Sequence, residues 1–212
     1  MAEPSTVAAV QKALEGAKKR NFVETVELAI NLKDIDLTIP KNRIQDDIIL
    51  PHGRGRQVRV CVIGGGELAF KAKEVADAVI TPEELQVTAD DKKQVKKLAG
   101  EMDYFIAEAP LMAVVGKRLG IVLGPRGKMP KPIAPGADPA PIIESLRNTV
   151  SVRTRDKKTF HAPVGTVDME ASQIAENIDT VLKRVESKLE KGKMNIASMY
   201  VKTTMGPAER LF

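Results

Sequence analysis

Aromatic side chains are scarce in this 212-residue sequence: they make up 3% of it, and tryptophan is absent. Modules that bind RNA by stacking bases present aromatic residues on a sheet, so this class is disfavoured. A nucleic-acid partner would therefore be bound mainly through backbone and hydroxyl groups.

Cysteine and histidine are also rare. The only cysteine, Cys61, lies in the apolar run VRVCVIG and has no partner for a disulfide within the chain. We interpret it as a core residue in a reducing compartment. The two histidines, His52 and His161, are far apart in the sequence, beside proline-containing turns. These residues make no ligand cluster, so we expect no metal site, no cofactor and no hydrolytic chemistry.

Long apolar runs are missing as well. No run approaches the roughly 18–20 residues that a membrane span needs, and the N-terminus lacks the uninterrupted apolar stretch of a signal peptide. We therefore expect no membrane partner. The hydrophobic content of 43% is sufficient for buried cores. The excess of 33 basic over 28 acidic residues, +5, permits an anionic partner without requiring one.

The two ends of the sequence share one pattern, in which amphipathic helices accompany strands with one polar face. In chain order we expect a helix over 5–20, a strand over 21–32, a loop over 34–43 and a strand from 46. After residue 150 we expect a hairpin or twisted strand pair with a basic turn over 151–162, a helix over 172–193 and a strand over 196–203.

The middle of the sequence alternates short apolar strands with helices, which predicts a parallel, Rossmann-like sheet. Residues 58–64 are almost continuously apolar, as in a strand covered on both faces. The other expected elements are helices over 65–75, 90–101, 110–124 and 139–150, strands over 76–81 and 103–109, and a loop over 124–139.

Neither end of the chain is large enough to bury a core alone, whereas the two together make a domain of ordinary size. We therefore predict an α/β protein with a discontinuous domain formed by residues 1–53 and 150–212. Residues 54–149 form an inserted Rossmann-like domain, joined through mobile linkers.

A glycine-rich turn offers an enzymatic alternative. Residues 64–69 (GGGELA) follow a strand and match the dinucleotide fingerprint G-x-G-x-x-A, with Glu83 and Glu84 about 20 residues further on. Against this interpretation, Glu67 would place a carboxylate beside the phosphates. The other interpretation is a strand-to-helix turn whose small residues allow close packing.

Two basic segments could contact phosphates. Residues 124–132 (GPRGKMPKP) are stiffened by proline but lack the spacing of a Walker loop, so a solvated connector is an equal alternative. The hairpin at 151–162 has four basic residues against a single acidic one, Asp156. The candidate contacts are Arg126, Lys128 and Lys131 in the first segment and Arg153, Arg155, Lys157, Lys158 and His161 in the second.

The last strand ends in the run TTMGP. Hydroxyl groups on and after this strand, from Ser198, Thr203 and Thr204, are suited to bind a ribose 2′-OH. Met205 offers an adaptable apolar contact, and Gly206 permits close backbone approach. An ordinary strand end followed by a turn is the alternative.

Five motifs, taken in order, resemble the ribosomal protein L1 family, in its archaeal form: FVETVE at 22–27, LPHG at 50–53, GIVLGPRGKMP at 120–130, HAPVG at 161–165 and TTMGP at 203–207. The resemblance covers nearly the whole chain. It implies a two-domain fold with a split first domain and an inserted second domain, and no enzymatic activity.

The resemblance also implies a function. Members bind 23S-type rRNA of the large ribosomal subunit at the mobile L1 stalk, which moves with exit-site tRNA. Many members also repress translation of their own mRNA by binding a similar RNA structure. The chain is then expected to be cytoplasmic and ribosome-bound, and monomeric when free.

The family's RNA surface corresponds here to residues at the start of the first strand and the end of the last. Asn21 departs from the family pattern, because bacterial relatives often have lysine there, and Arg20 is the candidate substitute charge. Further contacts are implied for the basic hairpin, Arg153–Lys158, and secondary ones for the inserted domain. The central residues are Arg20, Asn21, Phe22, Glu24, Thr25, Ser198, Thr203, Thr204, Met205 and Gly206.

Overall fold

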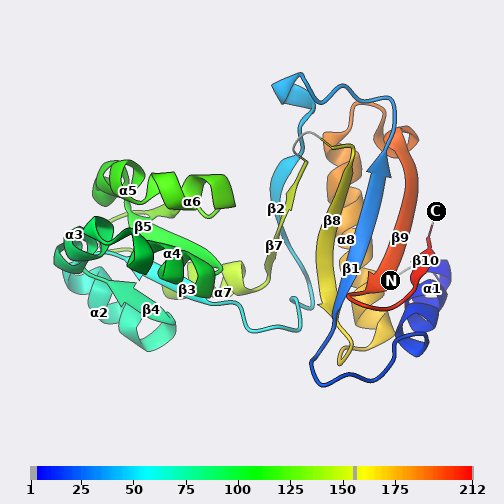
Figure 1. Ribbon diagram of the computed structural model, residues 1–212, viewed down its shortest axis with the longest axis horizontal. Coiled ribbons are helices and arrows are strands. Elements are labelled where there is room, and N and C mark those ends of the chain that lie inside the picture. The colour runs from blue at the N-terminus through cyan, green and yellow to red at the C-terminus, as the bar shows by residue number, and fades with distance from the viewer. Residues whose placement is uncertain (1–3, 155–156, 212) are drawn as a thin grey trace. The chain divides into compact units, whose positions relative to one another are not determined.

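The computed structural model describes residues 4–154 and 157–211. The chain divides into two compact units: unit 1 is Met1–Arg56 with Asn148–Phe212, and unit 2 is Gln57–Arg147. The sequence pattern places the boundaries a few residues away, after 53 and after 149. Antiparallel sheets lie in unit 1 and a parallel sheet lies in unit 2, so the predicted α/β fold class is confirmed (Figure 1).

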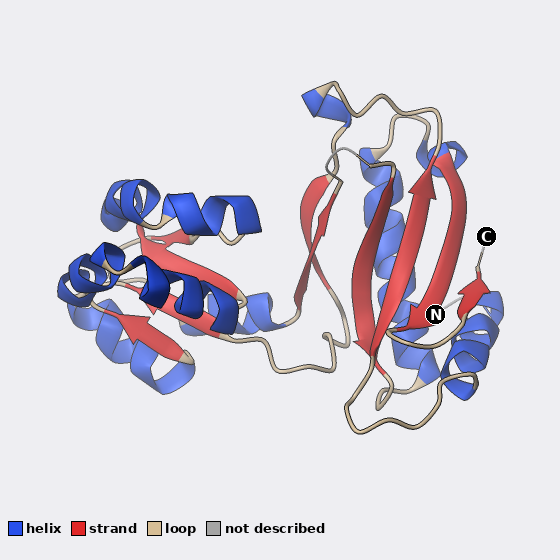
Figure 2. Ribbon diagram, viewed as in Figure 1, coloured by secondary structure: helices blue, strands red, loops and turns tan. Residues whose placement is uncertain are grey.

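Unit 1 is built on a four-stranded antiparallel sheet in the order β10-β9-β1-β8. Helices α8 and α1 pack on one face of it, and no described helix crosses the other face (Figure 2). We call this other face the outer face. The elements are α1 (Pro4–Glu15), β1 (Thr25–Leu32), β8 (Thr159–Thr166), α8 (Ala171–Lys188), β9 (Ile196–Thr203) and β10 (Ala208–Arg210).

The alternation of β1 explains the two faces of the sheet. Val26, Leu28 and Ile30 are fully buried in the core with the apolar stripe of α8. Each such side chain contributes about 1.5–3 kcal/mol when it is removed from water. Thr25, Glu27 and Asn31 alternate with them and are partly exposed on the outer face. The predicted half-buried strand is thus confirmed.

A second, two-stranded sheet in unit 1 corrects the predicted hairpin at 151–162. Strand β7 (Thr149–Arg153) pairs with β2 (Gln45–Ile49), whereas β8 pairs with β1. Thr154 joins β7 to β2, because its hydroxyl accepts from the Ile44 amide at 2.8 Å and its own amide donates to the Ile44 carbonyl at 2.8 Å. Short 3-10 turns occupy Pro40–Asn42 (η1) and Gly192–Asn195 (η3).

Unit 2 contains a parallel sheet in the order β4-β3-β5-β6. In β3, Val60 and Val62 pack with α2 and α7, while Cys61 and Ile63 pack with α3–α6 on the opposite face. The prediction of a strand covered on both faces is confirmed. The elements are β3 (Val60–Ile63), α2 (Gly66–Val75), β4 (Ala78–Ile80), α3 (Pro82–Asp90), α4 (Lys92–Glu101), β5 (Tyr104–Glu108), η2 (Ala109–Leu111), α5 (Met112–Arg118), α6 (Gly120–Arg126), β6 (Lys131–Ile133) and α7 (Ala140–Arg147).

The predicted loop at 124–139 is wrong at its beginning and middle. Helix α6 continues to Arg126 with Pro125 in its last turn, and β6 lies inside the expected loop. The helix ends at Gly127, whose φ of 72° is the left-handed conformation that glycine adopts without strain. The Gly127 amide donates to the Gly124 carbonyl and the Lys128 amide donates to the Leu123 carbonyl, which completes the end of the helix.

Candidate nucleic-acid interface

The start of β1 and the end of β9 lie side by side in unit 1, although they are far apart in the sequence (Figure 1). The Thr25 amide donates to the Thr204 hydroxyl at 3.2 Å, and the Thr204 amide donates to the Thr25 carbonyl at 3.0 Å. The threonine hydroxyl thus extends the ladder by one step beyond Thr203. We call the end of the sheet where β1 begins and β9 ends the Thr25 end.

Glu24 fixes the chain at the Thr25 end. Its side chain is almost fully buried, and its carboxylate accepts from the Met205 amide at 3.0 Å and pairs with the Arg20 guanidinium at 3.0 Å. The pKa of Glu24 lies below its usual value of 4.5, chiefly because the Met205 amide donates to it. The Thr203 hydroxyl and Arg20 act in the same direction, whereas burial opposes them. Glu24 and the buried Thr203 therefore position the segment that follows β9.

Three large apolar side chains are exposed at this end. Phe22 is 54% exposed, Val23 is 55% exposed and Met205 is 59% exposed. Phe22 and Val23 directly precede Glu24, and Glu24 binds the Met205 backbone, so the three residues gather around one buried carboxylate. We call this group the apolar corner. Exposed apolar groups of this kind mark interaction surfaces.

Gly206 allows the chain to turn away immediately after Met205. A Cβ atom added at Gly206 would lie 2.3 Å from the Thr203 hydroxyl oxygen, which is buried beside Glu24. A larger residue would therefore displace Thr203. The glycine is therefore required by close packing within unit 1.

Replacing Glu24 with glutamine should lower the stability of the protein in a pH-dependent way. The folded pKa of Glu24 is lowered, so its ionised form stabilises the fold above about pH 4.5, and this contribution is lost as the pH falls through the folded pKa. Urea unfolding should therefore show the largest difference between wild type and Glu24→Gln at neutral pH. The difference should narrow below about pH 4.5, and a difference independent of pH would contradict this role.

The outer face extends from the Thr25 end to a second polar group near the end of β1. The Asn31 side-chain Nδ2 donates to the Ser198 hydroxyl at 2.8 Å, and the Thr159 hydroxyl donates to the Asn31 side-chain Oδ1 at 2.7 Å. This row, the Asn31 row, crosses three strands about 20 Å from Thr25, at roughly 3.3 Å per residue. His161 lies between the two groups, exposed and opposite Ala29. Asn31 and Thr159 were not predicted as site residues; their signal was the polar alternation of two paired strands.

Three predicted basic contacts of unit 1 lie at the end of β7 and just before β8. Arg153, Lys157 and Lys158 are exposed, and the Leu32 amide donates to the Lys158 carbonyl at 2.9 Å at this end of β1. Arg155 lies outside the described residues. At the Thr25 end, Arg20 and Asn21 are exposed. The predicted contacts of unit 1 therefore lie at both ends of the four-stranded sheet and, for Arg153, on the two-stranded sheet.

The side chains predicted to contact RNA from unit 2 interact with carbonyl groups and a ring of unit 2. The Lys128 ammonium donates to the carbonyls of Ala99 and Met102, at 3.0 and 2.6 Å, where helix α4 ends. Such an interaction stabilises the negative end of a helix. Arg126 donates to the Lys96 carbonyl at 3.3 Å, and the Lys131 ammonium lies 6.0 Å from the centre of the Tyr104 ring.

Lys128→Met should lower the unfolding free energy by about 1–3 kcal/mol, because it removes two hydrogen bonds from a charged donor. Affinity for RNA should change by less than about twofold, since the ammonium group is bound to carbonyls. Lys117→Met, at an exposed position of α5, is the matched control and should leave stability unchanged. Unchanged stability of Lys128→Met with strongly weakened RNA binding would contradict the structural role.

In the glycine-rich turn at 64–69, Gly64 allows close packing, whereas Gly66 has a left-handed φ of 51° and no atom within 4 Å of an added Cβ. A Cβ atom at Gly64 would lie 2.5 Å from the Leu68 side chain. Glu67 pairs with Lys71 at 2.7 Å, and the Glu84 carboxylate accepts from the Thr81 amide at 3.0 Å in a capping box that begins α3. Glu84 is therefore engaged in a helix cap, away from the ribose-binding role of the fingerprint.

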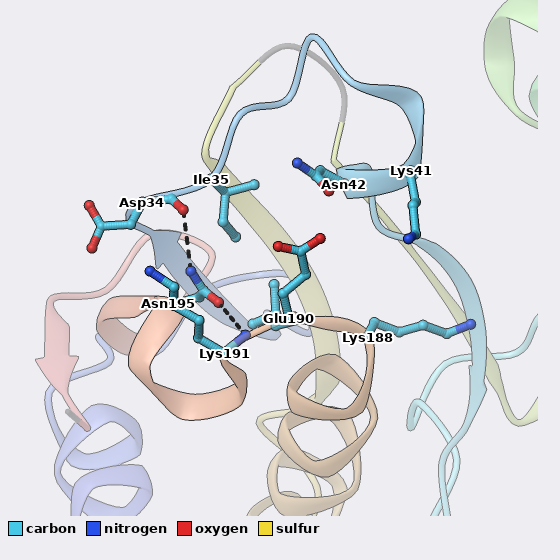
Figure 3. A pocket seen from close by; sticks show the side chains of 9 residues that line it. Asp34, Ile35, Lys41, Asn42, Lys188, Glu190, Lys191 and Asn195 are labelled. Atoms are coloured by element: carbon cyan, nitrogen blue, oxygen red, sulfur yellow. Dashed lines mark hydrogen bonds between the residues drawn. The ribbon is translucent and has the colours of Figure 1, made fainter.

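A hollow of about 90 Å³ lies at the other end of unit 1 (Figure 3). The buried Asn195 side chain donates from Nδ2 to the Lys33 and Asp34 carbonyls, at 3.1 and 3.4 Å. Its Oδ1 accepts from the Lys191 backbone amide at 2.9 Å. These bonds fix the 33–42 loop to the segment after α8. Charges of both signs, including Lys188 and Glu190, line the hollow.

Neither a metal cluster nor a membrane span is found in the part of the chain that the structure describes. Over residues 4–154 and 157–211, no three histidine, cysteine or acidic side chains are grouped to hold a metal ion. None of the described helices is long and apolar enough to cross a membrane.

Comparisons with known proteins agree on one family. The family described as "Ribosomal protein L1p/L10e family" matches residues 12–207. "Large ribosomal subunit protein uL1" of Methanocella arvoryzae is 53% identical over 212 residues, which is 100% of both chains. The protein of the same name from Thermoplasma acidophilum is 55% identical over 200 residues, 94% of this chain and 92% of the relative. That from Archaeoglobus fulgidus is 53% identical over 206 residues, 97% and 96% of the two chains.

Proposed function

Because the chain belongs to the ribosomal protein L1p/L10e family, we propose that it binds the rRNA of the large ribosomal subunit at the L1 stalk. A ribosomal protein of this family is not an enzyme. The RNA-binding surface is the outer face of the unit 1 sheet, with the apolar corner as its centre. The observation that supports this assignment best is the exposure of Phe22, Val23 and Met205 around the buried Glu24.

The proposed roles of the individual residues follow from their exposure. Phe22 and Met205 make apolar contacts with bases and riboses, and the backbone carbonyls of Thr204 and Gly206 accept from ribose hydroxyls beside them. The amides of these two residues already donate to the Thr25 and Thr203 carbonyls. Glu24 and Thr203 are buried and position this segment. The remaining contacts are Thr25, Ser198 and His161 on the outer face, Arg20 and Asn21 beside the apolar corner, and Arg153, Lys157 and Lys158 as cations that attract phosphates.

Two finer functions belong to the same proposal. The chain takes part in the movement and release of exit-site tRNA, for which unit 2 adds secondary contacts such as Arg126 and Lys131. It also represses translation of its own mRNA. A surface that recognises RNA by shape and hydroxyl groups would accept a second RNA of the same shape, which supports the second function.

Binding to a stalk fragment of large-subunit rRNA, compared with a scrambled fragment of equal length over a salt series, tests the proposal. We expect tight binding of the stalk fragment and weak binding of the scrambled one at every salt concentration. Cations contribute to both, so both affinities should fall with salt while their ratio is retained. Equal affinities for the two fragments would contradict the proposal.

A further inference from the structure

A groove of about 470 Å³ opens beside the apolar corner in unit 1. It lies between the end of α1, the segment that leads into β1 and the turn that follows β8. Leu14, Ala17 and Val167 give it an apolar lining, and the more than half-exposed side chains of Phe22 and Val23 continue that lining toward solvent. A planar apolar ring could be held against these groups.

The charges around the groove are unevenly distributed. Lys18, Lys19 and Arg20 follow one another along it, with Glu24 and Asp168 as its acidic residues. Glu24 is buried and neutralised by Arg20 at 3.0 Å. Two exposed lysines and one exposed carboxylate, that of Asp168, therefore remain around the groove. The groove thus offers an anion site and a hydrogen-bond acceptor beside an apolar lining.

The combination matches the parts of a nucleotide. Apolar and aromatic side chains hold the face of a base, and lysines bind its phosphate. The volume is in the range of about 300–1,000 Å³ that accommodates small molecules of this size. Bases inside a duplex are stacked and cannot enter such a groove, whereas unpaired bases of RNA loops and bulges can.

We propose that the groove binds one unpaired nucleotide of the RNA held on the outer face, with its phosphate at Lys18 and Lys19. This proposal rests on the proposed function, because it takes the nucleotide from the bound rRNA. The base lies against Phe22 and Val167, and the Asp168 carboxylate accepts from its edge. Guanine is the preferred base, because its two adjacent N–H donors match the two oxygens of a carboxylate.

A free guanine nucleotide would share this chemistry, so the experiment separates the two sources. Binding of the stalk rRNA fragment is measured for wild type, Lys18→Ser/Lys19→Ser and Asp168→Asn, all at exposed side chains. Lys12→Ser/Lys183→Ser removes the same charge at exposed positions of α1 and α8 and is the control. In parallel, each unpaired guanine of the fragment is replaced with uracil, and guanosine monophosphate is titrated alone and against RNA.

We expect about a tenfold loss of affinity for the lysine pair, about a fivefold loss for Asp168→Asn and less than a twofold loss for the control. Replacing one unpaired guanine should reproduce the Asp168→Asn loss, with no further loss when both changes are combined. Guanosine monophosphate, if it binds, should be displaced by the fragment.

The proposal is overturned if wild type prefers the stalk fragment over the scrambled one while both groove variants bind like wild type. It is also overturned if no guanine replacement is coupled to Asp168, or if guanosine monophosphate occupies the groove undisturbed by RNA. Failure of wild type to distinguish the two fragments would instead contradict the proposed function itself.

Discussion

Met205→Asp is expected to weaken binding of the stalk rRNA fragment about a hundredfold, or ~2.7 kcal/mol. The methionine is 59% exposed and its backbone is fixed by Glu24, so the substitution removes an apolar contact at the centre of the surface. It also introduces a carboxylate where phosphates approach. Because the side chain points to solvent, the unfolding free energy should change little. Calorimetric titration at fixed salt, with urea unfolding alongside, measures both effects.

Met194→Asp is the matched control for this prediction. Met194 is 75% exposed in η3, just before the start of β9 and far from the Thr25 end along that strand. The substitution makes the same change of charge and size, and we expect it to alter affinity by less than about threefold. Equal losses for the two variants would show that general repulsion, and not a local contact at Met205, causes the weakening.

Asn177→Leu is expected to lower the unfolding free energy by about 3–5 kcal/mol. Asn177 is fully buried in α8. Its side-chain Nδ2 donates to the carbonyls of Gly53 and Val164, at 2.9 and 2.8 Å, and its side-chain Oδ1 accepts from the His52 backbone amide at 3.2 Å. Leucine has a similar volume but leaves three backbone groups without this partner, each at a cost of about 1–3 kcal/mol. Urea or thermal unfolding measures the loss.

Asn42→Leu provides the comparison for Asn177→Leu. Its side chain makes one hydrogen bond, to the Asp36 carbonyl at 3.0 Å, in an exposed setting. We expect a loss below about 1 kcal/mol at this position. If Asn177→Leu cost no more than this, the buried bonds to Gly53, Val164 and His52 would not be what holds the 52–53 segment against α8.

The sequence was most informative where one physical pattern dominated. The alternation of Val26, Leu28 and Ile30 with polar residues predicted a strand with one wet face, and the structure places those three residues in the core. The apolar run around Cys61 predicted a strand covered on both faces, and its alternate residues enter two separate clusters. Such patterns report burial directly, so they need no knowledge of distant contacts.

Pairing between distant segments was harder to predict. Residues 151–162 have the alternation and turn of a hairpin, yet β7 pairs with β2, and Thr154 bonds to Ile44, more than a hundred residues earlier. Strand β10 has three residues, too few to show alternation. Helix α3 did have a signal, since Thr81, Pro82 and Glu84 form the sequence of a capped helix start.

In the candidate site, too, local features were predictable and contacts between distant segments were not. The motifs indicated Phe22, Thr204 and Met205, but nothing local to them showed that Glu24 would be buried beneath Met205. Likewise, the basic character of Lys128 was evident in the sequence, whereas its engagement with the end of α4 depends on a contact that only the fold creates. The chemical type of each residue was known from the sequence, but whether its side chain is exposed to solvent was not predictable.

The central claim is that the apolar corner provides specificity while the basic residues provide general affinity. The most direct measurement is the ratio of affinities for the stalk fragment and the scrambled fragment, at one salt concentration, in wild type, Met205→Ala and Lys157→Ser/Lys158→Ser. We predict that Met205→Ala lowers the ratio about tenfold, because it weakens only the stalk complex. The lysine variant should weaken both complexes and leave the ratio unchanged. A ratio that falls in the lysine variant and stays constant in Met205→Ala would contradict the account.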